Sequence, residues 1–119
     1  MATSRYLPAE NLNLIISNTQ TCIAKLNVGF WYNITPNQII TFTDGEREVD
    51  VIIQSLSFFS NFGDAWFTHG EKLIPSSIAN IITVGDAIKY YRNHYSSEDT
   101  IACGVVVFCF HVNSPVRKL

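Results

Sequence analysis

The segment Val105–Phe110 is apolar on both of the faces that a β-strand presents. Val105, Val107 and Cys109 alternate with Val106, Phe108 and Phe110. Because successive side chains of a strand point to opposite faces, this strand must be covered on both sides. We therefore predict an interior strand over Gly104–Val112. The run is also much shorter than the roughly 20 residues that a membrane-spanning helix needs.

The composition narrows the class of protein. The chain has 119 residues, which is within the usual range for one domain, and we expect residues 1–119 to form one. Hydrophobic residues make up 47% and charged residues only 15%, so an intrinsically disordered chain and a coiled coil are excluded. The net charge of -2 provides no overall basic field, so any nucleic-acid site must be a local patch.

The cysteines and the N-terminus favour an intracellular protein, either cytoplasmic or nuclear and not secreted. The 3 cysteines are an odd number without the spacing of a disulfide framework. Met1–Arg5 carries a single basic residue, and no apolar stretch of signal-peptide length follows it. We expect no membrane partner.

Three segments predict strands around a tight turn. Thr19–Leu26 alternates between two faces, as a half-buried strand does. Gln38–Thr43 and Glu48–Leu56 are rich in β-branched residues, and Asp44 and Gly45 between them are typical of a hairpin turn. A β-hairpin is therefore predicted here.

Two helices are predicted on the outside of the sheet. Pro8–Ser17 has apolar residues at helical spacing, and Asn18 would end that helix. Thr83 and Asp86 have the spacing of a capping box, and the apolar pattern behind them predicts a helix over Val84–Tyr95. With two or three helices outside a sheet, the predicted fold class is α+β, mostly β.

Two further segments are assigned by composition. Five aromatic residues fall close together and are expected to pack as a helix or loop over the core: Phe58, Phe59, Phe62, Trp66 and Phe67. Residues Asn113–Leu119 are expected to be an exposed tail.

Several segments resemble the ASCH domain, a relative of the PUA fold. Asn18–Lys25 stands where that family has its Gly-x-Lys-x-x-Glu-x-Arg motif, and Pro36–Phe42 resembles the strand that follows. Val49–Phe62 resembles the next strand, and Glu71–Pro75 with the later helix and last strand completes the order. The resemblance covers about residues 8–112.

The resemblance implies a small β-barrel of five or six strands, closed or nearly so, with two or three flanking helices and a cleft that binds RNA or nucleotides. Small stand-alone domains of this kind occur in cells and in viruses. Some members hydrolyse the amide bond of acylated cytidines with the motif lysine and a nearby Thr or Glu, and others are described as ribonucleases.

This chain departs from the family motif where catalysis would need it. Gln20 replaces the lysine and Ile23 the acidic residue, and neither can act as a base. The resemblance therefore implies a noncatalytic module that binds single-stranded RNA or a modified nucleotide. The candidate binding residues are Gln20, Thr21, Lys25, Arg47, Lys72, Arg92 and Tyr95.

Each candidate has a structural alternative. Lys25 can be a solvated strand residue, Gln20 and Thr21 can satisfy backbone groups, and Tyr95 is expected in the core. Two other functions stay open. One is a nucleoside hydrolase or ribonuclease with Thr21 as nucleophile and Glu71 or Asp64 as base; the other is a protein-interaction domain that has lost its ligand.

We expect no metal site and no cofactor. Cys103, Cys109 and His111 lie on one face of a strand, but a further ligand from Cys22, His69 or His94 would have to converge by folding, and no zinc spacing is present. Thiols on an apolar strand should stay protonated and inert. The glycines are isolated, so a phosphate-binding loop is excluded.

Overall fold

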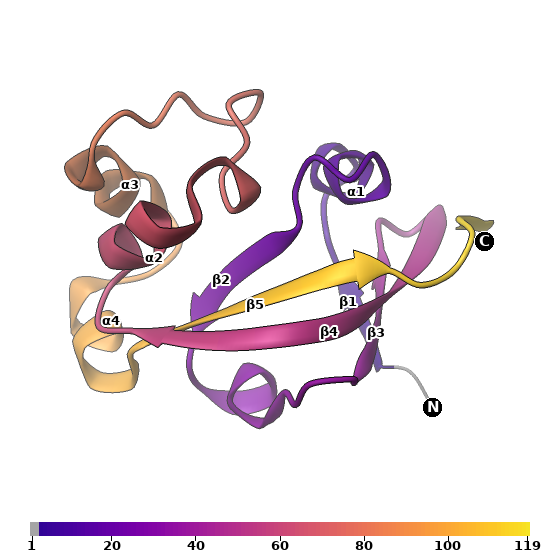
Figure 1. Cartoon of the computed structure of the whole chain (residues 1–119), viewed down its shortest axis with the longest axis horizontal. Helices are drawn as coiled ribbons and strands as arrows, with labels where there is room; N and C mark the ends of the chain where they lie inside the picture. Colours follow the sequence, from indigo (N-terminus) through magenta and orange to yellow (C-terminus); the bar gives the residue numbers. More distant parts are fainter. Residues whose placement is uncertain (1–2) are drawn as a thin grey trace.

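A computed structural model describes residues 3–119, which form one six-stranded sheet with helices around it (Figure 1). The strands are β1 (Thr3–Tyr6), β2 (Cys22–Leu26), β3 (Ile39–Thr43), β4 (Arg47–Phe59), β5 (Val105–Val112) and β6 (Arg117–Lys118). The helices are α1 (Ala9–Ile16), α2 (Phe62–His69), α3 (Val84–Tyr91) and α4 (Ser97–Cys103), with short 3-10 helices η1 (Gly29–Asn33) and η2 (Gly70–Lys72). The predicted class, α+β and mostly β, is confirmed.

The strand order is β1-β3-β4-β5-β2, with β6 added to β4. Strand β5 pairs with β4 on one side and with β2 on the other, so the predicted interior strand is confirmed. Its residues Val105 to Phe108 are all buried. β4 is 13 residues long and pairs with β3 near its start and with β5 along most of its length.

The sheet curls into a half-barrel, so the expectation of a closed or nearly closed barrel is wrong. Within residues 3–119, the two edge strands β1 and β2 do not pair with each other. Helix α1 joins them in sequence, and its Leu12 and Ile15 are fully buried in one cluster with Ile23 of β2 and Ile40 of β3. Apolar side chains of a helix therefore cover the side that another strand pairing would have closed.

Local signals in the sequence account for most element ends. The predicted hairpin joins β3 to β4, and Gly45 at its turn has a φ of 96°, a conformation that glycine tolerates. Asn18 follows α1 with a φ of 61°. The capping box of Thr83 and Asp86 is present, but α3 ends at Tyr91, earlier than predicted. The strand predicted from Thr19 begins only at Cys22.

Two apolar clusters lie on opposite faces of the sheet. One fills the concave face, where Trp31 of η1 stacks on Phe108 with ring centroids 5.0 Å apart. The other lies between β2, β5 and the helices, and joins Ala24 and Val107 to Phe62 of α2 and Tyr91 of α3. Helices α2 and α3 thus cover the part of the sheet that ends at the edge strand β2 (Figure 1).

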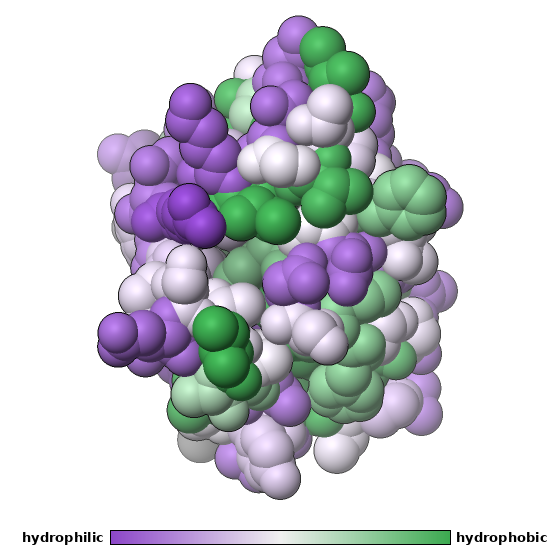
Figure 2. Space-filling view, turned by 90° about the vertical axis from the view of Figure 1, so that its left-hand side faces the viewer, coloured by the Kyte–Doolittle hydropathy of each residue, from purple (hydrophilic) through white to green (hydrophobic). Residues whose placement is uncertain are grey.

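The helical side of the molecule differs from prediction in two respects. The described residues form four α-helices rather than two or three, because Ser97–Cys103 forms α4. Among the clustered aromatics Phe62 is buried, whereas Phe58 and Phe67 are 64% and 77% exposed and do not pack. Figure 2 shows this side of the molecule, where apolar and polar side chains are interspersed.

The residues expected as an exposed tail extend the sheet. Most residues from Asn113 onward are exposed, but Arg117 and Lys118 form β6 against the start of β4. The Arg117 guanidinium contacts a carboxylate oxygen of Glu48 at 2.8 Å and one of Asp50 at 2.8 Å. The sequence gives no strand pattern here, because tertiary pairing and these ion pairs hold the segment.

Candidate functional site

A cleft of about 450 Å³ opens between α1, the edge strand β2 and the C-terminal end of α3. We call it the α1–α3 cleft. Its walls come from segments far apart in the chain: Leu7, Pro8, Glu10, Asn11, Gln20, Ile23, Ala24, Lys25, Leu73, Ile74, Ile78, Tyr90, Tyr91, His94 and Tyr95. The volume falls within the range of small-molecule sites, roughly 300 to 1,000 Å³.

Gln20 lies in this cleft just before β2 begins, and its amide orientation is determined by its partners. The amide nitrogen donates hydrogen bonds to the carbonyl oxygens of Cys22, at 3.2 Å, and Leu73, at 3.1 Å. Only the NH₂ group can donate to two carbonyls, so the amide oxygen must point elsewhere. That oxygen is buried and has no hydrogen-bond partner among residues 3–119. Gln20 therefore lines the cleft and carries an amide oxygen that is free to accept a hydrogen bond.

Lys25 is a basic residue that lines the same cleft. Its ammonium nitrogen lies 5.4 Å from the centre of the Trp31 ring, and the residue is half-buried. Within residues 3–119 it makes no ion pair. Burial lowers the pKa of Lys25, because the charged form loses solvation. A bound anion would offset that loss.

Three tyrosines on and after α3 form the opposite wall. Tyr91 and Tyr95 both stack on Phe62, with ring centroids 4.2 and 5.0 Å away. Tyr90 meets Tyr91 edge to face at 5.2 Å. Burial raises the pKa of all three phenols, so each remains a neutral hydrogen-bond donor near neutral pH. The wall is therefore aromatic and able to donate hydrogen bonds.

The cleft residues that the sequence reasoning did not name as binding candidates include Glu10, Tyr90 and His94. Glu10 lies in the first turn of α1, where an acidic residue is also explained by the helix dipole. It lies near Tyr90, because the charge of Glu10 contributes to the raised pKa of that phenol. No signal in the sequence could have shown this proximity.

The other predicted residues lie outside the α1–α3 cleft. Thr21 does not line it, and its hydroxyl has the Cys22 sulfur as its hydrogen-bonding neighbour at 4.0 Å. Arg47 is held by Asp44 at 2.9 Å and by Asn13 at 2.8 Å. Lys72 is exposed on η2. Arg92 lines a second hollow that shares Tyr91 and Tyr95 with the cleft.

The carboxylates considered as catalytic bases form no hydrogen bond with Thr21 in the described part of the chain. Asp64 caps α2 together with Asn61, and Glu71 is exposed on η2. The structure thus shows no nucleophile and base pair among the residues that the sequence suggested.

The cysteines also differ from expectation. Cys103 and His111 do not join Cys109; instead Cys22 and His69 lie beside it, with all ligand atoms within 4.8 Å of one another. The convergence that the sequence left to folding is therefore present for Cys22 and His69, whereas Cys103 and His111 take no part in it. Spacing along the chain could not reveal a cluster that the sheet register and α2 create.

Across residues 3–119, none of the helices combines the length and apolar character needed to cross a bilayer. Several apolar side chains are nevertheless exposed on the helical side, namely Phe67, Ile82 and Ile101, at 77%, 72% and 84%. They are the feature that an interaction with another protein would use.

Comparison with known proteins gives structural matches only. No family profile and no curated protein sequence matches this chain. The crystal structure of hypothetical protein PH0355 superimposes with a TM-score of 0.81 at 23% identity, covering 95% of this chain and 100% of that one. The solution structure of protein PF0455 from Pyrococcus furiosus gives 0.77 at 22% identity, covering 97% and 100%. The crystal structure of ASCH from Zymomonas mobilis gives 0.66 at 12% identity, covering 98% of this chain and 71% of that one.

Proposed function

The chain has a divergent ASCH fold, and we propose that it binds a nucleotide, either free or within single-stranded RNA, in the α1–α3 cleft. One observation carries the proposal: two residues that line the same cleft have polar groups without partners among residues 3–119. Lys25 is half-buried and makes no ion pair, and the buried amide oxygen of Gln20 accepts no hydrogen bond. A nucleotide combines the groups that would satisfy both. Its phosphate would pair with Lys25, and a base or ribose donor would reach Gln20.

The aromatic wall supports the same ligand class. Bases in single-stranded nucleic acid are recognised by stacking on aromatic rings and by hydrogen bonds to their edges. Tyr90 and Tyr95 supply a ring and a phenolic donor each, and both line the cleft. The second hollow, with Arg92, adjoins the cleft at Tyr95, so a strand longer than one nucleotide would place a further phosphate near that guanidinium.

The charge of the cleft limits the length and strength of binding. Glu10 lies in the cleft with Lys25, so the cleft is not a continuous positive channel. Few phosphates can be neutralised, and we expect a dissociation constant of roughly 1 to 100 µM that rises with salt. A free nucleoside monophosphate should therefore bind nearly as well as a short RNA strand.

The proposed role is binding without catalysis. Gln20 cannot accept a proton from a hydroxyl, and its amide nitrogen is already committed to two backbone carbonyls. Thr21 lies outside the cleft-lining residues and has no carboxylate as a hydrogen-bond partner among residues 3–119. The residues that line the cleft position a ligand by charge, stacking and hydrogen bonds.

The test is a titration of cytidine monophosphate and of a labelled single-stranded RNA against the Lys25→Met variant. Methionine keeps the apolar stem beside Trp31 and removes the charge. Losing one charge-assisted contact should weaken binding roughly 10-fold or more at about 50 mM salt. The slope of the logarithm of the binding constant against the logarithm of the salt concentration should become shallower by the amount that one phosphate contact contributes.

Lys118→Met is the matched control, because it removes the same charge from the exposed strand β6. It should change affinity less than about 2-fold, since Lys118 does not line the cleft and an exposed charge is screened by salt. Equal affinities for Lys25→Met and the unsubstituted protein would contradict the proposal. Failure of both ligands to bind would favour a protein partner at the exposed apolar residues Phe67, Ile82 and Ile101.

A further inference from the structure

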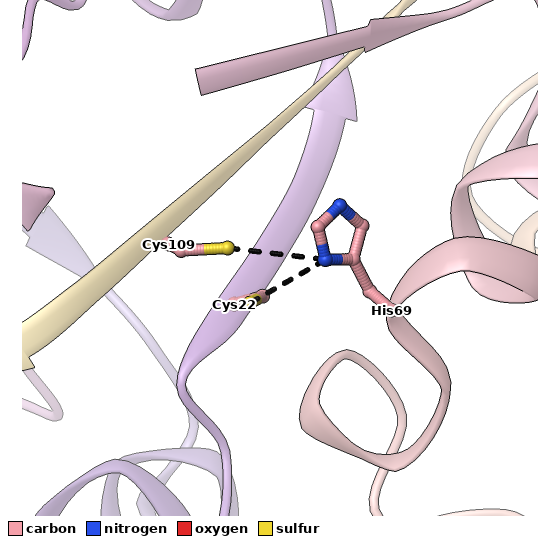
Figure 3. Close-up of side chains that lie close together, drawn as sticks. All are labelled: Cys22, His69 and Cys109. Carbon is pink, nitrogen blue, oxygen red and sulfur yellow. Dashed lines mark hydrogen bonds between the residues drawn. The ribbon is translucent and has the colours of Figure 1, made fainter. Parts of the chain in front are cut away.

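Two cysteines and a histidine from three separate elements meet on the outer face of the sheet (Figure 3). Cys22 begins β2, Cys109 lies in β5 and His69 is the last residue of α2. The Nδ1 atom of His69 lies 3.9 Å from the sulfur of Cys22 and 3.9 Å from the sulfur of Cys109. One imidazole nitrogen therefore faces both sulfur atoms.

The sheet register holds the two cysteines together. Cys22 and Cys109 are directly opposite in the antiparallel pair of β2 and β5. The amide of Phe110, the residue after Cys109, donates to the carbonyl oxygen of Thr21, the residue before Cys22. Cys22 and Cys109 are therefore a non-hydrogen-bonded pair of the antiparallel ladder. At such positions the Cα atoms are only about 4.5 Å apart and the side chains approach closely.

The position of His69 is also determined by the fold. Gly70 caps the C-terminus of α2; it has a φ of 55°, and its amide donates to the carbonyl oxygen of Trp66. The ring of Phe59 meets the imidazole edge to face with centroids 5.8 Å apart. The Nε2 atom is buried without a hydrogen-bond partner in the described residues. Among these residues the two sulfur atoms are the hydrogen-bonding neighbours of Nδ1, so a metal ion bound between the three atoms would replace those contacts.

The donor atoms of the cluster are those that bind zinc. A metal ion would take the two sulfur atoms as thiolates and the imidazole in its neutral form, and binding would release the protons that they carry.

We propose that Cys22, Cys109 and His69 bind one zinc ion, with a fourth coordination position left to solvent. In a tetrahedral site, bond lengths of about 2.3 Å to sulfur and 2.0 Å to nitrogen place ligand atoms about 3.5 to 3.8 Å apart. The sulfur-to-nitrogen separations of 3.9 Å need to shorten by only a few tenths of an ångström. Small rotations of the side chains are enough.

The donor set selects the class of metal. The cluster contains two sulfur atoms and one nitrogen and no carboxylate, which disfavours calcium and magnesium. Two thiolates would neutralise a divalent ion, and Cys₂His with one open position is a known zinc arrangement. Cys22 is buried while Cys109 and His69 are half-buried, so an ion has access from the solvent side.

The test uses Co²⁺ as a spectroscopic substitute for zinc in the fully reduced protein. We expect one equivalent of Co²⁺ to bind with the visible absorption of tetrahedral cobalt and a near-ultraviolet thiolate-to-cobalt band. Zn²⁺ should displace it, and competition with a chromogenic chelator should give the zinc affinity. Binding should also raise the unfolding midpoint, because the metal stabilises only the folded state.

Cys109→Ser should weaken zinc binding about 100-fold or more and remove most of the thiolate band. His69→Gln, at the end of a helix, should weaken binding while circular dichroism shows an intact fold. Cys103→Ser is the matched control, because Cys103 is the remaining free cysteine and ends α4 away from the cluster. It should bind zinc as the unsubstituted protein does.

Two results would overturn the proposal. One is the absence of Co²⁺ and Zn²⁺ binding by protein in which all three thiols react with a thiol reagent. The other is binding that Cys109→Ser and His69→Gln leave unchanged, or that Cys103→Ser weakens to the same extent. Either result would place the metal elsewhere or nowhere.

Discussion

Replacing Gly63 with alanine should destabilise the protein, although the same change stabilises most helices. Gly63 is buried in α2, where it faces α3. A Cβ atom there would lie 2.5 Å from Cγ1 of Val84 and 2.9 Å from Cγ1 of Ile88. Optimal carbon contacts are about 3.5 to 4.0 Å, so Val84 would have to retreat by about 1 Å. Both neighbours are β-branched and have few alternative rotamers.

The magnitude follows from two opposing effects. Overpacking a core costs about 1 to 3 kcal/mol in unfolding free energy. We take about 3 kcal/mol, because the new Cβ would make three contacts of 3.0 Å or less with Val84 and Ile88. Alanine gains about 1 kcal/mol over glycine in a helix. The balance is a loss of about 2 kcal/mol. At about 4 °C per kcal/mol for a domain of this size, the unfolding midpoint should fall by about 8 °C.

Thermal unfolding followed by circular dichroism measures this fall, with Gly85→Ala as the matched control. Gly85 lies in α3, and its Cβ would meet only Oγ1 of Thr83, at 3.7 Å. That variant should gain about 2 to 4 °C. Adding Val84→Ala to Gly63→Ala should restore part of the loss, because it empties the space. A Gly63→Ala variant as stable as Gly85→Ala would refute the close packing of α2 on α3, and with it the position of the tyrosine wall.

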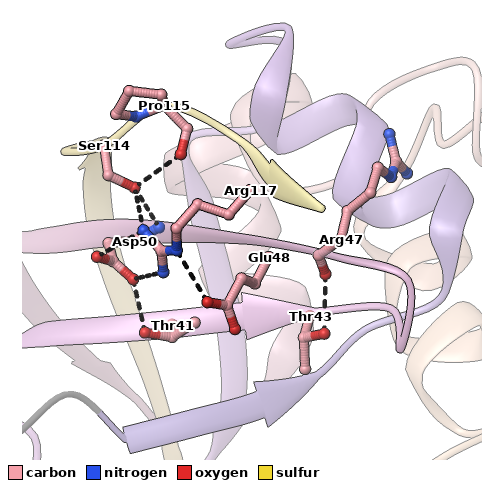
Figure 4. A network of polar contacts seen from close by, with 8 residues as sticks. All are labelled: Thr41, Thr43, Arg47, Glu48, Asp50, Ser114, Pro115 and Arg117. Carbon is pink, nitrogen blue, oxygen red and sulfur yellow. Dashed lines mark hydrogen bonds and ion pairs between the residues drawn. The ribbon is translucent and has the colours of Figure 1, made fainter. Parts of the chain in front are cut away.

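Two further predictions concern the tail and the chemistry of the motif strand. Arg117→Met should lower the unfolding midpoint at pH 7, because it breaks the contacts with Glu48 and Asp50 (Figure 4). The hydrogen bonds of Arg117 and then Thr41 lower the pKa of Asp50 in the folded protein. The stabilisation by Arg117 is therefore fully present above the unfolded pKa of Asp50, about 3.9, and is lost as the pH falls through the folded pKa. A difference in unfolding midpoint between Arg117→Met and the unsubstituted protein that stays constant down to pH 3 would contradict this prediction. N4-acetylcytidine should not be hydrolysed above background, because Gln20 supplies no base; turnover that Thr21→Ala abolishes, measured by chromatography of the products, would establish an enzyme instead.

The parts of the fold that carry their own local signal were predictable from the sequence. The doubly apolar Val105–Phe110 run requires an interior strand, and the capping box of Thr83 and Asp86 places the start of α3. β1 and β6 have no comparable pattern, since each is held by pairing with β3 or β4. α4 is short and polar, and the Ser96 cap is its main signal.

The candidate site was predictable only in part, for a topological reason. Gln20 and Lys25 could be named because the motif strand places them, and Tyr95 because of its helical spacing. Glu10 and His94 enter the cleft only through the packing of α1 and of the segment after α3. Cys22 and His69 likewise meet Cys109 through sheet register and the end of α2, which no spacing along the chain encodes.

The most direct test of the nucleotide-binding cleft is to map chemical-shift changes in the protein's amide spectrum as cytidine monophosphate is added. The largest changes should occur at residues lining the cleft, including Gln20, Lys25, Tyr90 and Tyr95, and the Lys25→Met variant should reduce them. Changes centred on another surface, or no changes at millimolar nucleotide, would contradict the assignment of the α1–α3 cleft as the ligand site.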